Sequence, residues 1–146
     1  MQGIAQTAHR IEDRRFLRGE GRYLADIRPE GCTAMVVVRS PHGNARIGGI
    51  DTAVALAMPG VLAVLTAADV ATAGAKALPC LAEIGKWDWA RPVLPSRPLL
   101  AADQVRHVGE PVAVVIAETP DMARDAADMV VVDYEPLETC ATVEQA

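Results

Sequence analysis

Residues 94–137 read LPSRPLLAADQVRHVGEPVAVVIAETPDMARDAADMVVVDYEPL, and this stretch decides the fold. Its most apolar run, Val112–Ala117, is bounded on both sides by proline and polar residues. A short apolar run without polar alternation is typical of a strand that is buried on both faces. We therefore expect Val114 and Val115 both to be fully buried.

A helix follows this run, and a second apolar segment follows the helix. Thr119 suits the N-cap and Pro120 suits the first helical position, so the sequence predicts a helix over 120–129. Its apolar residues fall on one face at helical spacing, namely Met122, Ala126, Met129 and Val130. Residues 131–134 predict a return strand. A strand–helix–strand unit in one sheet is expected to be parallel and right-handed.

An earlier part of the chain has the same order of elements. Its predicted strand, short helix and strand lie at Cys32–Arg39, 53–58 and Val61–Leu65. Asp51 is the expected cap of the helix, and Thr66 begins a capping-box-like turn. The two strand–helix–strand units, at 33–65 and 112–134, predict an α/β fold with a mixed sheet.

The chain is expected to divide into an N-terminal arm with an entry turn, residues 1–31, and one α/β domain, residues 32–146. The segment Arg10–Leu17 mixes both charge signs with apolar side chains. This composition fits an anchor onto a neighbouring domain, and it also fits a solvated segment with a few apolar contacts.

Residues 74–98 interrupt the pattern with four prolines and contain both tryptophans, Trp87 and Trp89. In an extended segment these two side chains would lie on the same face. They fit an exposed pair that meets a partner domain, and they fit a cover for this domain's own core equally well.

Charge and hydropathy exclude several classes of protein. The 146 residues carry a net charge of −5 with a pI near 5.1, and no dense Lys/Arg cluster favours nucleic acid or an anionic membrane. No apolar run approaches the roughly 20 residues that span a bilayer. The N-terminus lacks an apolar core of signal-peptide length. We therefore expect a cytoplasmic protein.

The cysteines and histidines are too scattered to predict a metal site. Cys32, Cys80 and Cys140 form no C-x-x-C motif, and the histidines lack a paired-ligand spacing. We expect reduced thiols that are buried or partly buried. The Gly19-Glu20-Gly21 segment lacks the third glycine of a dinucleotide-binding loop, so it carries little weight.

Three long segments resemble one protein family. Residues 97–137, RPLLAADQVRHVGEPVAVVIAETPDMARDAADMVVVDYEPL, resemble the N-terminal α/β hammerhead domain of the molybdenum hydroxylase large subunit. That family includes xanthine dehydrogenase, aldehyde oxidase and the aerobic carbon monoxide dehydrogenases. Residues 10–27 and 39–70 are similar to the family segments that precede it. The resemblance covers about Arg10 to Thr142 and implies the hammerhead fold.

Glu110 lies in a Gly-Glu-Pro motif, and the family has such a motif around its active-site glutamate, the general base. That glutamate lies near the C-terminal end of the large subunit, whereas Glu110 precedes a predicted strand and matches the hammerhead's own motif. We interpret Glu110 as a turn residue and His107 as a turn or surface residue. We assign no catalytic, cofactor-binding or metal-binding residue to the chain.

The resemblance implies a non-catalytic structural domain of a molybdopterin-dependent oxidoreductase. The complete enzyme would hydroxylate an aromatic heterocycle or aldehyde, or oxidise carbon monoxide, with molybdopterin in this subunit and iron–sulfur and FAD in partner subunits. The chain alone is expected to be inactive, to bind none of these cofactors and to self-associate. The alternative is a free-standing interaction or ligand-binding module that reuses the fold. The parent's substrate stays open.

Overall fold

The computed structural model describes residues 10–79 and 96–145. It contains two compact units, residues 1–32 and 33–146. The described part of the first unit has a short helix, α1 (Asp13–Leu17), and a 3-10 turn, η1 (Leu24–Asp26). The rings of Phe16 and Tyr23 stack with their centroids 5.7 Å apart. Since no residue of α1 is buried, this unit has little core of its own.

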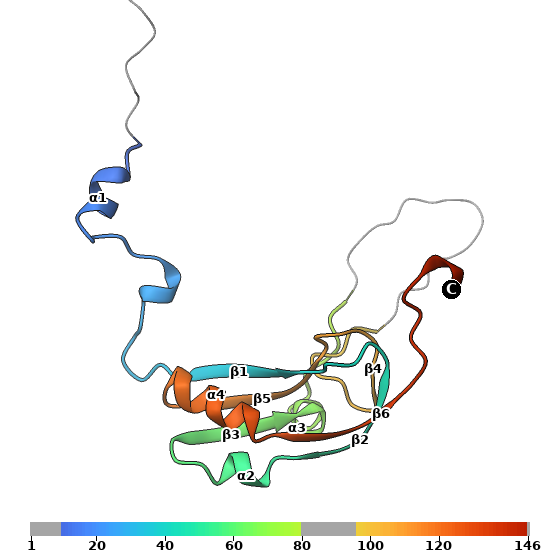
Figure 1. The fold of residues 1–146 in the computed structure, drawn as a ribbon. Coiled ribbons are helices and arrows are strands. Elements are labelled where there is room, and N and C mark those ends of the chain that lie inside the picture. Colours follow the sequence, from blue (N-terminus) through green and yellow to red (C-terminus); the bar gives the residue numbers. More distant parts are fainter. Residues whose placement is uncertain (1–9, 80–95, 146) are drawn as a thin grey trace, which may run out of the picture. The chain divides into compact units, whose positions relative to one another are not determined.

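The second unit contains short strands and helices in the order β1 (Ala34–Arg39), β2 (Ala45–Asp51), α2 (Ala53–Leu56), β3 (Val61–Thr66), α3 (Ala67–Thr72), β4 (Gln104–Val105), β5 (Pro111–Ala117), α4 (Pro120–Asp128), β6 (Val131–Pro136) and η2 (Val143–Gln145). They form two sheets with the strand orders β1-β5-β3 and β4-β2-β6 (Figure 1). The α/β fold class is confirmed. Every described pair of neighbouring strands is antiparallel, so the sheets are not mixed as expected.

The predicted parallel return strand is wrong. β6 does not share a sheet with β5, because it pairs with β2 in the second sheet. β2 was not predicted, since its sequence ARIGGID has two glycines in place of packing side chains. A Cβ at Gly48 would lie 2.6 Å from an oxygen of the Asp133 carboxylate, so another residue there would have to displace this exposed side chain. Gly48 thus leaves room for the Asp133 side chain of β6, whereas a Cβ at Gly49 would meet no atom within 4 Å.

The predicted helix after β5 is present, and its capping is as expected. Thr119 Oγ1 accepts a hydrogen bond from the Met122 amide at 3.2 Å, and Pro120 occupies the first turn. The predicted apolar face is partly wrong, because Met129 is 44% exposed. Ala126 is buried as predicted, and the second side chain buried in this helix is that of Ala123, which was not predicted. Alanine allows the helix backbone to lie close to the strands.

The other predicted helical starts also have structural counterparts. α2 is shorter than predicted, and the Asp51 carboxylate accepts from the Ala53 amide at 2.9 Å although Thr52 is the N-cap residue. At α3 the capping box between Thr66 and Asp69 is present. The Thr66 backbone amide donates to the Asp69 carboxylate, which lowers the pKa of that carboxyl.

Two clusters of buried residues form the core of this unit. Val115, Val64, Ala55 and Ala126 pack between the sheet β1-β5-β3 and the helices α2 and α4. The second cluster contains Val112, Ala45, Ala101 and Val105, and it joins β5 to the sheet β4-β2-β6. β5 contributes to both clusters, so it is the central strand of the domain.

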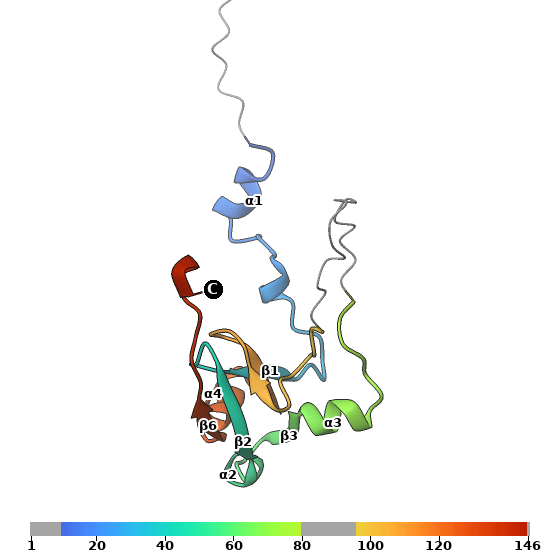
Figure 2. The ribbon, with the colours of Figure 1, turned by 90° about the vertical axis from the view of Figure 1, so that its right-hand side faces the viewer.

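Only one of the two expected burials in β5 is correct. Val115 is fully buried, but Val114 is only half-buried. α4 covers the face that carries Val115, whereas α3 lies on the other side of the sheet and has no buried residue (Figure 2). The apolar run Val112–Ala117 has apolar side chains on both faces of β5. The described elements of this unit cover only one of these two faces along the whole strand.

Candidate functional site

The turn before β5 contains the Gly-Glu-Pro motif, which is the part of the sequence that most resembles a catalytic motif. Gly109 has φ +86°, a conformation that favours glycine. Its amide donates to the Ser40 carbonyl at 2.8 Å, and the Ser40 amide donates to the Glu110 carbonyl at 2.9 Å. Arg39 Nη1 donates to the Gly109 carbonyl at 2.8 Å. These bonds fix the turn to the end of β1.

The Glu110 carboxylate is directed into this same turn. Its residue is 8% exposed, and Oε2 accepts a short hydrogen bond from the Arg106 backbone amide. His107 Nδ1 lies 3.5 Å from the same oxygen, with the His107 side chain 67% exposed. A carboxylate that satisfies a backbone amide four residues earlier stabilises a turn. The geometry therefore supports the interpretation of Glu110 and His107 as turn residues. That Glu110 takes no part in catalysis stays a prediction.

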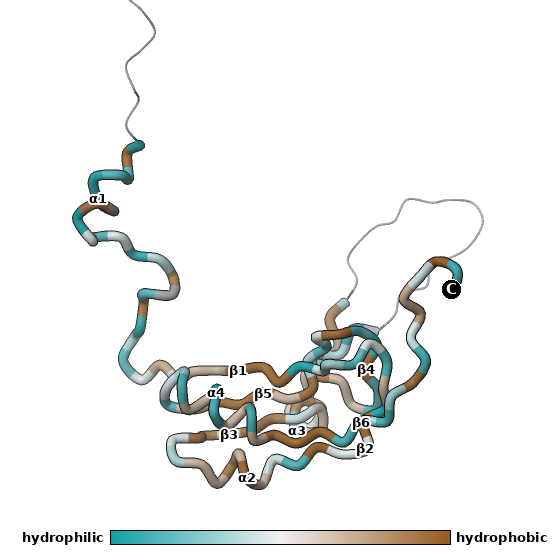
Figure 3. Tube along the Cα trace, viewed as in Figure 1, coloured by the Kyte–Doolittle hydropathy of each residue, from teal (hydrophilic) through white to brown (hydrophobic). Residues whose placement is uncertain are grey.

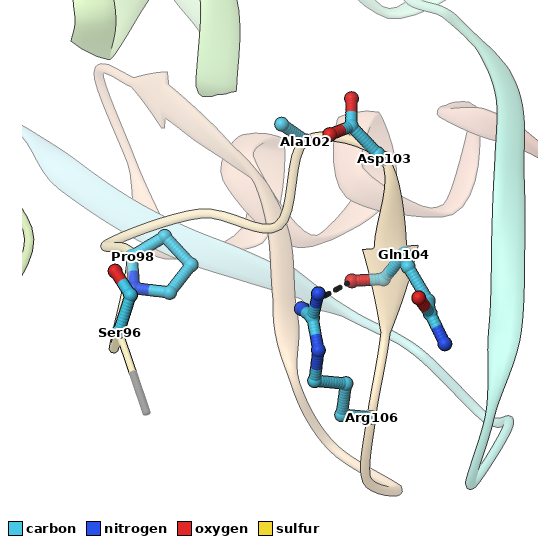
Figure 4. Close-up of a pocket in the computed structure, with 6 residues that line it drawn as sticks. All are labelled: Ser96, Pro98, Ala102, Asp103, Gln104 and Arg106. Atoms are coloured by element: carbon cyan, nitrogen blue, oxygen red, sulfur yellow. Dashed lines mark hydrogen bonds between the residues drawn. The ribbon is translucent and has the colours of Figure 1, made fainter. Parts of the chain in front are cut away.

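Two hollows lie beside this turn on the surface. One, of about 370 Å³, is lined by Ser96, Pro98, Ala102, Asp103, Gln104 and Arg106 (Figure 4). Within it the Arg106 guanidinium donates to the Gln104 carbonyl at 3.3 Å. The adjacent hollow, of about 460 Å³, reaches His107 and Glu110. Glu110 is already bound to the turn, so it is not poised as a base in these hollows. The first hollow does present the Asp103 carboxylate beside the Gln104 amide and the Arg106 guanidinium.

Ser40, His42 and Tyr134 form a polar cluster that the sequence did not single out. Ser40 is 2% exposed, and its Oγ accepts from the His42 amide at 3.0 Å and donates to the His42 carbonyl at 3.3 Å. These bonds go to the backbone of His42, so they do not form a nucleophile–base pair. The only available signal was the Ser-Pro-His turn after a strand.

The Tyr134 ring packs edge-on against the His42 ring at a centroid distance of 4.9 Å. The Tyr134 hydroxyl is buried and has no hydrogen-bond partner among the described residues. Burial raises the pKa of the Tyr134 phenol, and the neighbouring Ser40 side chain partly offsets that rise. The cluster thus packs the segment after β1 against β6.

The thiols are not placed as expected. Cys32 and Cys140 are exposed, which corrects the predicted burial, and Cys140 Sγ donates to the Gln145 carbonyl at 2.9 Å. Cys32 is the last residue of the first unit and Cys140 lies near the end of the second, and neither residue belongs to a strand. Cys80 lies outside the described residues, as do Trp87 and Trp89.

That this chain binds no molybdenum cofactor by itself stays a prediction. Within residues 10–79 and 96–145, no three His, Cys, Asp or Glu side chains come together in a way that could hold a metal ion. Gly19 and Gly21 follow the helix α1, whereas a dinucleotide-binding loop follows a strand. We therefore derive no chemical step through such a group on this chain. In the same described ranges, no helix has the length and apolarity needed to cross a membrane.

Comparisons with known proteins identify the domain. Residues 18–138 match the family described as aldehyde oxidase and xanthine dehydrogenase, a/b hammerhead domain. The large subunit of nicotine 6-hydroxylase from Paenarthrobacter nicotinovorans is 42% identical over 92% of this chain, which spans 16% of that relative.

Solved structures agree with this match. The Cu,Mo-CO dehydrogenase has a TM-score of 0.75 at 39% identity, over 94% of this chain and 16% of that one. Quinoline 2-oxidoreductase from Pseudomonas putida 86 has a TM-score of 0.77 at 39% identity, over 92% of this chain and 16% of that one. The chain therefore belongs to the a/b hammerhead domain family of aldehyde oxidase and xanthine dehydrogenase.

Proposed function

We propose that this chain is the non-catalytic hammerhead domain of a molybdenum hydroxylase large subunit. One observation carries the proposal: nearly all of the chain matches a region that makes up only 16% of each relative. Activity of the whole protein is then expected to reside outside these residues. The internal bonding of Glu110 supports this view, because the one glutamate in a catalytic-looking motif is part of a turn.

The complete protein would bind molybdopterin in its other large-subunit domains and would work with iron–sulfur and flavin subunits. The relatives differ in the substrates that their names give, so the substrate class stays open between heterocycles, aldehydes and carbon monoxide. A cytoplasmic location stays a prediction. The free-standing module has no support in the comparisons, whose named relatives are large subunits or whole oxidoreductases.

Metal analysis and a hydroxylase assay on two preparations test the proposal. The first preparation is the complete product of the reading frame that encodes this chain, purified with its partners; the second is the 146-residue chain. We expect molybdenum and substrate-dependent electron transfer in the first preparation only. Stoichiometric molybdenum in the second, or a complete product without molybdenum, would overturn the proposal.

A further inference from the structure

The sheet β1-β5-β3 has a second face that the described elements of its own unit cover only in part. Antiparallel register places Met35, Ile116 and Ala63 opposite one another, and likewise Val37, Val114 and Leu65. Directly opposed residues share a face. The residues Met35, Val37, Ala63, Leu65, Val114 and Ile116 are called the open face below.

The open face is entirely apolar, and it is continuous across all three strands. Figure 3 shows the apolar character along β1, β5 and β3. Met35 is 64% exposed, and the other members of the open face are half-buried. At one end of β5, Val112 on the same face is fully buried by the second cluster. Burial on this face therefore decreases from Val112 to Val114 and Ile116, although the sequence stays apolar.

This arrangement is unusual for a sheet that faces water. An antiparallel sheet with one solvated face alternates apolar and polar residues along each strand. The strands β1, β5 and β3 do not alternate in this way, because their residues on the open face are apolar as well. Contiguous apolar patches of this kind mark surfaces that contact another body. The apolar sequence of these three adjacent strands thus fits a face that packs against another body. The described part of this unit does not supply that body.

We propose that the open face docks against another domain of the same large-subunit polypeptide, in the region that lies outside residues 1–146. This inference rests on the proposed function. The occupant is chosen because the relatives devote most of their length to regions beyond the 16% that this chain matches. A matching surface would be apolar and free of charge at its centre, since a buried unpaired charge is costly.

Two matched substitutions test the proposal. Met35→Glu places a charge on the open face, and Val131→Glu places the same charge on β6. Both positions are strand residues and both are 64% exposed. In the isolated 146-residue chain the two variants should melt as the parent does, because each carboxylate would lie in water.

In the complete polypeptide the two variants should differ. Met35→Glu should undock the domain and speed its release by limited proteolysis, as a fragment near 15.5 kDa, by about tenfold or more. Val131→Glu should leave the release rate unchanged. Equal rates for the two variants, or a reading frame that ends at residue 146, would overturn the proposal.

Two further outcomes would assign the open face to another occupant and reject this one. If Met35→Glu destabilises the isolated chain as strongly as the complete polypeptide, the cover lies within these 146 residues. If the isolated chain is a dimer in light scattering that Met35→Glu dissociates, with the complete polypeptide unaffected, the cover is a second copy. Molybdenum content of the complete polypeptide is measured in parallel, because its loss in the unsubstituted protein would refute the proposed function and not the docking face alone.

Discussion

Val114 and Val115 are neighbours in β5 and have the same side chain, yet they have different surroundings. Val115 is fully buried beneath α4 and α2, whereas Val114 is half-buried on the open face. Burial depends on what packs above a residue, and the hydrophobicity of the residue itself does not supply that cover. The comparison separates the part of the core that this chain completes from the part that it leaves open.

The largest expected effect is that of Val115→Asp. The substitution would bury an unpaired charge between the sheet and α4. Its cost should consume much or all of a stability margin of about 5–15 kcal/mol, so we expect loss of cooperative unfolding in a thermal melt. Val131→Asp is the control, because its exposed site should change the free energy of unfolding by about 0.5 kcal/mol or less. A Val115→Asp variant that melts as the parent does would place this face at the surface.

The second test compares the two faces directly with the same change. Val115→Ala should cost about 2 kcal/mol in the isolated chain, and Val114→Ala about half of that or less. Denaturant titrations of both variants give the two values. If the open face is covered in the complete polypeptide, the cost of Val114→Ala should rise there towards that of Val115→Ala. Equal costs in the isolated chain would contradict the observed difference in burial.

The third test concerns the turn that leads into β5. Glu110→Ala removes the acceptor of the Arg106 amide and should cost about 1–3 kcal/mol. Glu110→Gln keeps an oxygen at that place, so the loss should be smaller. Turnover of the complete enzyme should be nearly unchanged in Glu110→Gln, whereas loss of a general base costs roughly 100- to 10,000-fold. A loss of that size with the cofactor retained would make Glu110 catalytic.

The smallest expected effect is at Tyr134, where the buried hydroxyl has no partner among the described residues. Tyr134→Phe should leave the domain equally stable or more stable by about 1 kcal/mol. The pKa of this phenol is raised in the folded chain above its ordinary 10.0, so the folded state holds the proton at a pH where the unfolded state has lost it. Stability should therefore fall as pH rises above about 10, and less steeply in Tyr134→Phe. Identical slopes for parent and variant would contradict the burial of this hydroxyl.

Local sequence signals predicted the helices α2, α3 and α4 and most of the strands, but not the helix α1. The Thr119-Pro120 start of α4 and the Thr66 capping box involve only residues close in sequence, so both could be predicted from the sequence. β2 escaped prediction because Gly48 and Gly49 remove the side chains on which strand patterns depend. For the turn at Glu110, sequence correctly predicted the local role that the geometry supports, but it did not predict the contacts with Arg39 and Ser40.

The amino-acid sequence by itself determined most of the elements, the capping of α3 and α4, and the family, because these depend on neighbouring residues and on long motifs. Only the tertiary structure decided that β6 pairs with β2 and not in the sheet of β5, and that Ala123 is buried while Met129 is exposed. Only the tertiary structure showed that Val114 lacks the cover of Val115. The physical reason is that strand partners and helix cover join residues far apart in the chain, and a periodic pattern of apolar residues fixes neither of them.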